Sequence, residues 1–461
     1  MFKKILLISI VCLLIQLNST AFDNVSSINN ILNSYDFDRD STVSISVKDK
    51  KTGKIIYSKN PYKYSNPASV LKLFTMAASL NELGEDYKFT TAFYKDKNNN
   101  LYLKLSADPM LTSNDLNILA QNLKQNHKGR INKIYIDDSI IDLIPYPMGW
   151  TNDDYWPNSP KISPYTADKN TVKVDFLLSE NKKDVRIVQK DSYKFSFVNK
   201  LQISDKTDFT FVEDVFHNTV NIEGTISKNV IDKEIPVLNP KYFFCKKLND
   251  ALDKNGINFS EKFLFARVPQ DVTIVAKFER PVDEVIKYVL RTSDNQAAET
   301  VFKVAGGKYA QKENPVKRDI CCFGTTKSGI SMFLNYLSGL ELDIKQIKIR
   351  DGSGVSRYNA VNTDFLVSAL SKMNFDYEKY LPTGGEGTLS KRMRELKDSV
   401  YFKTGTLFGT SSLSGIVKSC EDEYYFASII TSYNRNKSLI KAVEDEIVYE
   451  IYRRGGEYEE N

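Results

Sequence analysis

Histidine is nearly absent from this chain. Among 461 residues there are only His127 and His217, and neither stands at metal-ligand spacing from another histidine, a cysteine or a pair of carboxylates. The scarcity argues against a histidine-dependent serine or cysteine hydrolase and predicts no metal site. If the chain has a general base, we expect it to be a side chain other than imidazole.

The chain also has few cysteines and only a small net charge. The formal net charge is only +5, spread along the chain, which gives no case for nucleic acid as a partner. Beyond the first 21 residues four cysteines are present, too few for a disulfide scaffold in so long a chain. Their pairing stays open; they are Cys245, Cys321, Cys322 and Cys420.

Long apolar runs are missing except at the amino terminus. Lys3 and Lys4 precede the apolar stretch 5–17, and small residues follow at Ser19-Thr20-Ala21. The stretch is shorter than the ~20 residues of a spanning helix, so we predict a signal peptide over 1–21 and a periplasmic protein. A membrane anchor is the alternative. Peripheral membrane contact is not indicated, and the oligomeric state is left open.

Three short motifs stand in a chemically meaningful order. Ser69-Val70-Leu71-Lys72 is followed by Ser293-Asp294-Asn295 and then by Lys403-Thr404-Gly405. The set S-x-x-K, S-D-N and K-T-G is used by class A β-lactamases and penicillin-binding proteins. It supplies a serine nucleophile, a lysine three residues on at helical spacing to activate it, a relaying serine with an orienting amide, and a strand beside the site.

The first and last motifs have further copies or near-copies, and the middle one has looser S-x-N matches at Ser58 and Ser227, so context decides which copies matter. The S-x-x-K at Ser179 lies among charged residues typical of a solvated turn, whereas Ser69 opens an apolar, helix-like run. Lys51-Thr52-Gly53 falls in a charged hairpin turn, and Lys327-Ser328-Gly329 precedes a helix-like segment, whereas Lys403 is flanked by strand-like runs. Taken alone, Ser69 could equally be a helix N-cap.

The expected secondary structure changes twice along the chain. Residues 89–282 are rich in short alternating strands, whereas the segments on either side combine helices with strands. We therefore predict an α/β (α+β) serine β-lactamase/transpeptidase-like domain, an antiparallel sheet flanked by helices, with β-rich inserted domains. The expected bounds are a catalytic domain over 22–88 and 283–461, an inserted domain II over 89–170 and 238–282, and a β-rich domain III over 171–237.

Longer blocks carry a family resemblance over nearly the whole mature chain. Ser106-Ala107-Asp108-Pro109 is similar to a G-D-P segment with alanine in the usual glycine place, and residues 351–359 read D-G-S-G-V-S-R-Y-N. Residues 381–389 carry a related Gly-rich block, one residue shorter than usual. Together with the motifs, they resemble the D-alanyl-D-alanine carboxypeptidase/endopeptidase family of class C low-molecular-mass penicillin-binding proteins, the DacB-like S13 peptidases.

The resemblance implies roles for specific residues and a peptidoglycan stem peptide as substrate, with β-lactams as inhibitors and no cofactor. The oxyanion would sit between the backbone N–H groups of Ser69 and Thr406. Asp153 or Asp154 is expected to bind a diaminopimelate ammonium, and Arg357 its carboxylate. The remaining expected residues are Ser69, Lys72, Ser293, Asn295 and Lys403 for catalysis, and Thr404, Gly405 and Thr406 for the substrate carboxylate.

Two other interpretations stay open. The chain could be a non-catalytic penicillin-recognising or wall-binding protein on the same scaffold, since motif residues do not prove turnover. It could also be a β-lactamase, but Ser293 follows Lys72 by 221 positions, an insertion that class A β-lactamases lack, and Gly329-Ile330-Ser331 offers no carboxylate where a deacylating glutamate is expected.

Overall fold

A computed structural model describes residues 27–181, 183–259, 262–313, 324–419, 422–432 and 434–454. The predicted signal peptide and Cys321, Cys322 and Cys420 lie outside these ranges. The chain forms two compact units. The first contains the described parts of 1–78, 286–294 and 333–461, and the second those of 79–285 and 295–332. The domain bounds expected from the sequence stay a prediction.

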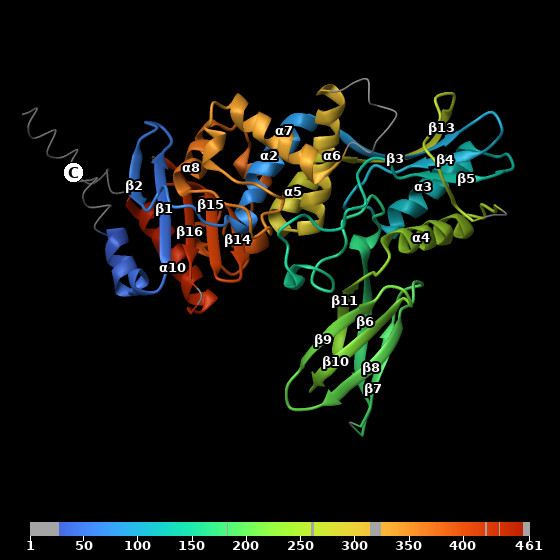
Figure 1. The fold of residues 1–461 in the computed structure, drawn as a ribbon, viewed down its shortest axis with the longest axis horizontal. Coiled ribbons are helices and arrows are strands. Elements are labelled where there is room, and N and C mark those ends of the chain that lie inside the picture. Colours follow the sequence, from blue (N-terminus) through green and yellow to red (C-terminus); the bar gives the residue numbers. More distant parts are fainter. Residues whose placement is uncertain are drawn as a thin grey trace, which may run out of the picture. The chain divides into compact units, whose positions relative to one another are not determined.

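The first unit is built around a five-stranded antiparallel sheet (Figure 1). The strand order β14-β15-β16-β1-β2 places strands far apart in the sequence side by side, because β1, near the start of the described residues, pairs over its whole length with β16, near their end. The strands are β1 (Thr42–Asp49), β2 (Ile55–Lys59), β14 (Val400–Leu407), β15 (Thr410–Lys418) and β16 (Glu423–Thr431).

Helices cover both faces of this sheet, and its three central strands β15, β16 and β1 are largely buried, whereas the edge strand β2 is mostly exposed or half-buried. Val43, Ile45 and Val47 of β1 belong to one apolar cluster with residues of α10 (Lys437–Arg454). Ser46 points to the other face, where its hydroxyl hydrogen-bonds Thr363 Oγ1 of α8 (Thr363–Lys372) at 2.9 Å. The period of two along a strand therefore sends apolar side chains to α10 and small polar ones to α8.

Further helical segments complete the first unit or run into the second. A helical segment spans residues 27–34, and α9 covers Tyr377–Tyr380. Helices α2 (Leu71–Leu83), α5 (Val282–Thr292) and α7 (Thr326–Gly339) each cross from one unit to the other along the chain. The 3₁₀ turns of the first unit are η1 (Phe37–Arg39), η2 (Ala68–Val70), η6 (Ile344–Gln346), η7 (Gly387–Leu389) and η8 (Arg394–Leu396).

The second unit contains a mixed five-stranded sheet and two helices that pack together. In α3 the buried residues Leu116, Leu119, Ala120 and Leu123 recur at the spacing of one helix face. Thr112 and Asp115 form a capping box that starts the helix. The elements are β3 (Lys88–Lys95), β4 (Leu101–Lys104), β5 (Ile134–Asp137), β12 (Leu264–Phe265), β13 (Thr273–Pro281), α3 (Ser113–Asn126), α4 (Pro240–Lys254), α6 (Asn295–Glu313), η3 (Asn152–Asp154) and η4 (Asp168–Asn170).

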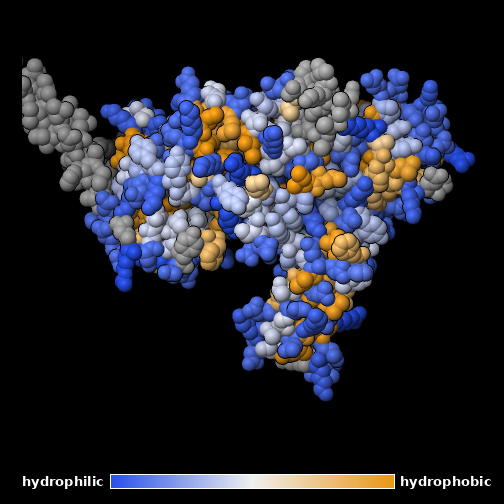
Figure 2. Space-filling model, in the orientation of Figure 1, coloured by the Kyte–Doolittle hydropathy of each residue, from blue (hydrophilic) through white to orange (hydrophobic). Residues whose placement is uncertain are grey.

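Residues 171–236 form a β-rich lobe of the second unit. Two three-stranded sheets, β11-β6-β7 and β8-β10-β9, enclose an aromatic core. In it the ring centroids of Phe176 and Phe209 lie 5.2 Å apart. Apolar side chains also reach its surface, where Figure 2 shows orange patches; Phe216 is almost fully exposed. The strands are β6 (Thr171–Leu178), β7 (Val185–Gln189), β8 (Ser196–Ile203), β9 (Asp208–Asp214), β10 (Thr219–Ile226) and β11 (Val230–Pro236).

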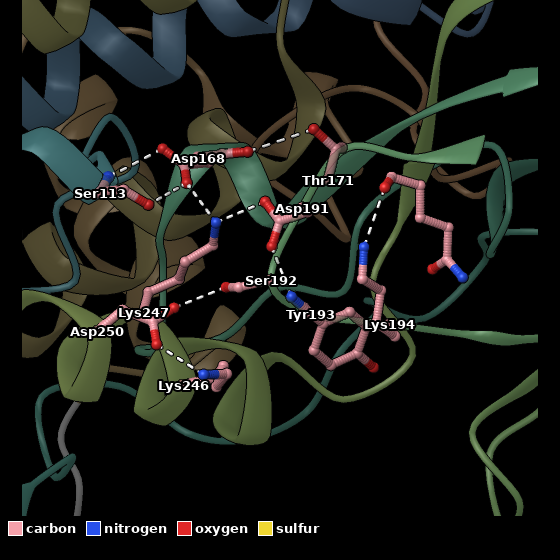
Figure 3. A network of polar contacts seen from close by, with 11 residues as sticks. Ser113, Asp168, Thr171, Asp191, Ser192, Tyr193, Lys194, Lys246, Lys247 and Asp250 are labelled. Atoms are coloured by element: carbon pink, nitrogen blue, oxygen red, sulfur yellow. Dashed lines mark hydrogen bonds and ion pairs between the residues drawn. The ribbon is translucent and has the colours of Figure 1, made fainter.

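A polar network ties this lobe to α3 and α4 (Figure 3). Lys247 of α4 lies 2.5 Å from Asp191, between β7 and β8, and 3.5 Å from Asp168, just before β6. Asp168 also accepts a hydrogen bond from the backbone N–H of Ser113 at the start of α3. Because Lys247 is largely buried, these ion pairs are shielded more from solvent than surface pairs.

A buried ion pair holds α10 in the first unit. Arg392 lies 3.1 Å from Glu444 and 2.6 Å from Asp445, and the Glu444 side chain is fully buried. Burial raises the pKa of Glu444, although the neighbouring Arg392 acts in the opposite direction. The carboxylate therefore depends on the guanidinium for its charge.

Replacing Arg392 by methionine should lower the stability of the first unit by about 3–5 kcal/mol, because Glu444 would be left buried without an adjacent cation. Urea denaturation followed by circular dichroism measures this as a lower midpoint. The exposed Lys437→Met on the same helix is the matched control. The double variant Arg392→Met/Glu444→Leu should regain most of the loss, and a double variant as unstable as the single one would contradict the explanation.

Candidate active site

Ser69 stands in a tight turn immediately before a buried helix. It is the middle residue of η2, and Lys72 follows as the second residue of α2. Lys72 Nζ lies 2.8 Å from Ser69 Oγ. Lys72 is fully buried, whereas Ser69 is half-buried. The pair therefore has hydrogen-bond geometry suited to proton transfer between a half-buried hydroxyl and a fully buried amine.

The turn before Ser69 requires an unusual backbone conformation. Ala68 has a φ of +48°, in the left-handed region that alanine seldom adopts. The side chain of Asn66 stabilises it by accepting a hydrogen bond from the Ala68 N–H at 2.9 Å. This conformation turns the chain from the preceding loop into α2 within one residue of the serine.

Lys403, the second buried lysine of the site, extends from strand β14. Its Nζ donates to Ser293 Oγ and to the carbonyl oxygen of Thr404, both at 2.8 Å. Burial, and then the nearby charge of Lys72, hold the pKa of Lys403 well below its usual range. Two like charges at close range disfavour each other, so the Lys403 ammonium is destabilised in the folded protein.

Gly405 is required by close packing between β14 and the serine turn. A Cβ atom at this position would lie 2.2 Å from Ser412 Oγ and 3.0 Å from both Ala68 Cβ and the Pro67 carbonyl oxygen. Ser412 Oγ also donates to that carbonyl at 2.7 Å, which fixes the turn against the sheet. The glycine of the K-T-G motif thus allows the strand to lie directly against the turn that carries Ser69.

Strand β14 lies at the edge of its sheet. The Phe402 N–H donates to Pro382 rather than to β15, so it points toward that edge. Alternation along the strand directs the N–H groups of Thr404 and Thr406 to the same side. These groups are the ones that an extended peptide laid along β14 would meet.

Ser293 lies in the short junction between α5 and α6. Its φ of 64° is left-handed, and its N–H donates to the Val289 carbonyl at the end of α5. The following Asp294 accepts a hydrogen bond from Tyr288 at 2.8 Å. Asn295 is the first residue of α6 and belongs to the second unit. Its expected role in orienting the peptide stays a prediction.

Within one unit the structure thus pairs Ser69 with Lys72 and Ser293 with Lys403 by hydrogen bonds, and the charge of Lys72 acts on Lys403. The expected stem-peptide contacts lie elsewhere in the chain. Asp153 is exposed, and Asp154 accepts hydrogen bonds from the Thr151 backbone and hydroxyl; both belong to η3 of the second unit. Arg357 donates to the Val355 carbonyl in the first unit. Their roles in binding stay predictions.

The competing copies of the motifs fall outside this arrangement. Ser179 Oγ donates to Asn181 within a surface turn, and Lys182 lies outside the described residues. Lys51 is exposed in the turn between β1 and β2, and Lys327 belongs to α7. Among the described residues, no group of three or more His, Cys, Asp or Glu side chains could hold a metal ion.

One contact to Lys72 was missed by the sequence analysis. The backbone carbonyl of Ser353 accepts a hydrogen bond from Lys72 Nζ at 2.8 Å. A backbone acceptor leaves no residue-type signal of its own. The available clue was the D-G-S-G block itself, to which the three short motifs assign no chemical role.

The fold is that of known penicillin-binding proteins. The crystal structure of penicillin binding protein 4 (dacB) from Haemophilus influenzae aligns with a TM-score of 0.80 at 21% identity, covering 92% of this chain and 99% of that one. A predatory peptidoglycan endopeptidase from Bdellovibrio bacteriovorus aligns with a TM-score of 0.51 at 16% identity, covering 90% and 92%. These similarities confirm the predicted fold class.

The chain belongs to the D-Ala-D-Ala carboxypeptidase 3 (S13) family, whose model matches residues 25–449. Among curated relatives, the D-alanyl-D-alanine carboxypeptidase of Actinomadura sp. (strain R39) is 27% identical over 89% of this chain and 81% of that protein. D-alanyl-D-alanine carboxypeptidase DacB of Haemophilus influenzae is 23% identical over 86% of each. The family resemblance predicted from the sequence blocks is confirmed.

Lys403→Met provides a test of the repulsion between the two buried lysines. The folded state disfavours the Lys403 ammonium, so wild type gains stability as the pH rises from the lowered folded pKa toward the unfolded value of about 10.5. The melting temperature of Lys403→Met relative to wild type should therefore be highest at low pH, and the difference should fall as the pH rises through that window.

Thermal unfolding between pH 6 and 10 measures this difference. Lys51→Met, in the exposed second K-T-G, is the matched control and should parallel wild type at every pH. A difference between Lys403→Met and wild type that stays constant over the whole range would contradict the lowered pKa.

Proposed function

We propose that this chain is a serine-type D-Ala-D-Ala carboxypeptidase that acts on peptidoglycan stem peptides through an acyl-enzyme at Ser69. The observation that carries the proposal is the 2.8 Å contact between Lys72 Nζ and Ser69 Oγ, with Lys403 and Ser293 paired in the same unit. Membership of the D-Ala-D-Ala carboxypeptidase 3 (S13) family supports the same reaction.

Acylation uses the two hydroxyl–lysine pairs in turn. Ser69 Oγ attacks the carbonyl carbon between the two terminal D-alanines, and its proton passes to neutral Lys72. The oxyanion is bound by the N–H groups of Ser69 and Thr406, where one donor is worth roughly 3–4 kcal/mol. When the C–N bond breaks, Ser293, linked to Lys403, delivers a proton to the leaving amine. Water then hydrolyses the ester.

The low pKa of Lys403 fits recognition of a carboxylate. A buried ammonium next to another lysine lacks an opposite charge, and the terminal carboxylate of the substrate supplies one. The hydroxyl groups of Thr404 and Thr406 would complete that contact. A β-lactam carries an equivalent carboxylate beside its reactive amide, which is consistent with the β-lactam complex known for the Haemophilus influenzae protein.

The same chemistry gives endopeptidase activity when the leaving amine belongs to a neighbouring stem peptide. In that case a diaminopimelate residue occupies the leaving-group side, and Asp153 or Asp154 is proposed for its ammonium and Arg357 for its carboxylate. Asp153 is the more exposed of the two acids. The related fold of a peptidoglycan endopeptidase supports keeping this second activity in the proposal.

Incubation with fluorescent penicillin should label Ser69, identified by mass spectrometry of the labelled peptide. Ser69→Ala should abolish the label, and Lys72→Met should slow acylation by about 10²–10⁴-fold through loss of the base. Ser179→Ala, in the second S-x-x-K, should label like wild type. Purified monomeric pentapeptide and crosslinked dimers should yield D-alanine and monomers, respectively.

Label without product would favour the non-catalytic penicillin-recognising protein. Rapid release of hydrolysed penicillin without D-alanine would favour a β-lactamase. No label at Ser69 would contradict the acyl-enzyme itself.

We also propose that the protein is exported to the periplasm by residues 1–21, where its substrate lies. The basic start, the short apolar stretch and the small residues before Phe22 support this. Among the described residues, no helix is long and apolar enough to cross a membrane. Amino-terminal sequencing of the protein recovered from the periplasmic fraction should begin at Phe22. Leu13→Arg should block processing, and an unprocessed chain in the wild type would contradict export by cleavage.

A further inference from the structure

The loop from Asp351 to Asn359 is organised by one buried carboxylate. Asp351 is fully buried, and its Oδ1 accepts hydrogen bonds from the Gly354 N–H at 3.0 Å and from Asn359 Nδ2 at 2.7 Å. Its Oδ2 accepts from the Ser356 N–H at 2.7 Å and from Ser353 Oγ at 3.3 Å. One side chain therefore fixes the path of the whole loop, because charge-assisted bonds of this kind are among the strongest available.

Two carbonyl oxygens of this loop contact the helix that carries the proposed base. The Ser353 carbonyl accepts from Lys72 Nζ at 2.8 Å, and the Gly352 carbonyl accepts from Thr75 Oγ1 at 2.6 Å. Lys72 and Thr75 are three residues apart and so lie on one face of α2. The loop is thus attached to α2 at two points, one of them the reacting nitrogen itself.

The same loop contacts the turn that carries the nucleophile. A Cβ atom on Gly354 would lie 1.9 Å from the Ala68 carbonyl oxygen, so the loop packs directly against the residue before Ser69. The Ser356 carbonyl accepts from Asn66 Nδ2 at 2.8 Å, and Asn66 in turn holds the left-handed Ala68. Nucleophile and base are therefore both supported from residues 352–356.

We propose that Asp351 is a positioning residue that aims the lone pair of Lys72 at Ser69 by fixing the Ser353 carbonyl. A neutral lysine has two N–H groups and one lone pair on Nζ. A carbonyl can accept only an N–H, so the Ser353 oxygen takes one of them and limits how the amine can rotate. The orientation left to Nζ presents its lone pair to the Ser69 hydroxyl. The inference rests on the proposed function, because it assigns Lys72 as the base.

The carbonyl also affects the charge of Lys72. Its oxygen stabilises an ammonium by accepting a charge-assisted hydrogen bond, and the charge of Lys403 on β14 opposes that ammonium. Asp351 adds a negative charge behind the loop. If the carbonyl moved away from Nζ, the Lys72 ammonium would lose a hydrogen-bond acceptor. Lys72 would then lose its proton at a lower pH, but its lone pair would be less well oriented toward Ser69.

The test is Asp351→Asn in the full chain, with the second-order rate constant for acylation by fluorescent penicillin measured from pH 5 to 9. An amide can accept at only one of its two ends, so Ser356 or Gly354 loses its acceptor and the loop shifts. We expect the plateau rate to fall by about 10- to 100-fold. We also expect the acid limb of the profile to move to lower pH. A merely unstable variant would lower the plateau and leave the limb in place.

Two further variants make the result decisive. Asp343→Asn removes a carboxylate that caps η6 in the preceding segment, and it should react like wild type. Thr75→Val keeps the side-chain shape but removes the second attachment of the loop, and it should slow acylation about 3- to 10-fold with the same movement of the acid limb. If Asp351→Asn does not fold, Thr75→Val alone decides.

The outcomes separate this inference from the proposed function. Wild type that is never acylated at Ser69 would refute the proposed function, and the inference with it. An active wild type, together with folded Asp351→Asn or Thr75→Val variants that match its rate and its pH profile, would overturn the inference alone. A lower plateau with an unmoved acid limb in both variants would also overturn it.

Discussion

Two lysines buried in one unit define the constraint on which this structure depends. Lys72 and Lys403 are both fully buried, and the charge of one acts on the other. Burying an ammonium without an opposite charge is costly, so each nitrogen needs fixed acceptors. Ser69 and the Ser353 carbonyl serve Lys72, and Ser293 and the Thr404 carbonyl serve Lys403. Those acceptors are the two hydroxyls that we propose to react and two backbone carbonyl oxygens.

Close backbone packing follows from the same constraint. Gly354 and Gly405 approach the serine turn from two sides, and a Cβ at either would collide with it. The turn in turn adopts a left-handed conformation at Ala68. Ala107 in the second unit also has a left-handed φ of 53°, a conformation that glycine adopts more easily than alanine. Close packing around the proposed site thus holds a residue such as Ala68 in a strained backbone conformation, and the same packing fixes the geometry of the site.

Prediction from sequence went furthest where residue type and spacing carry the information. The i, i+3 spacing of Ser69 and Lys72 anticipated their contact, although Ser69 lies in a 3₁₀ turn rather than inside the helix. Strand-like runs around Lys403 separated it from Lys51, which the structure places in an exposed turn. The Ser353 carbonyl could not be anticipated in this way, because every residue has a carbonyl and only the folded loop aims this one.

The sequence by itself therefore determined the family, the fold class and the set of chemically competent side chains, since motifs and blocks are local properties of the chain. Tertiary structure decided which of them meet. Lys72 and Lys403 are 331 positions apart in the sequence, and their mutual effect on charge exists only because β14 packs against the serine turn. The lowered pKa of Lys403, the edge position of β14 and the loop contacts of Asp351 all arise from burial and proximity, which no local pattern encodes.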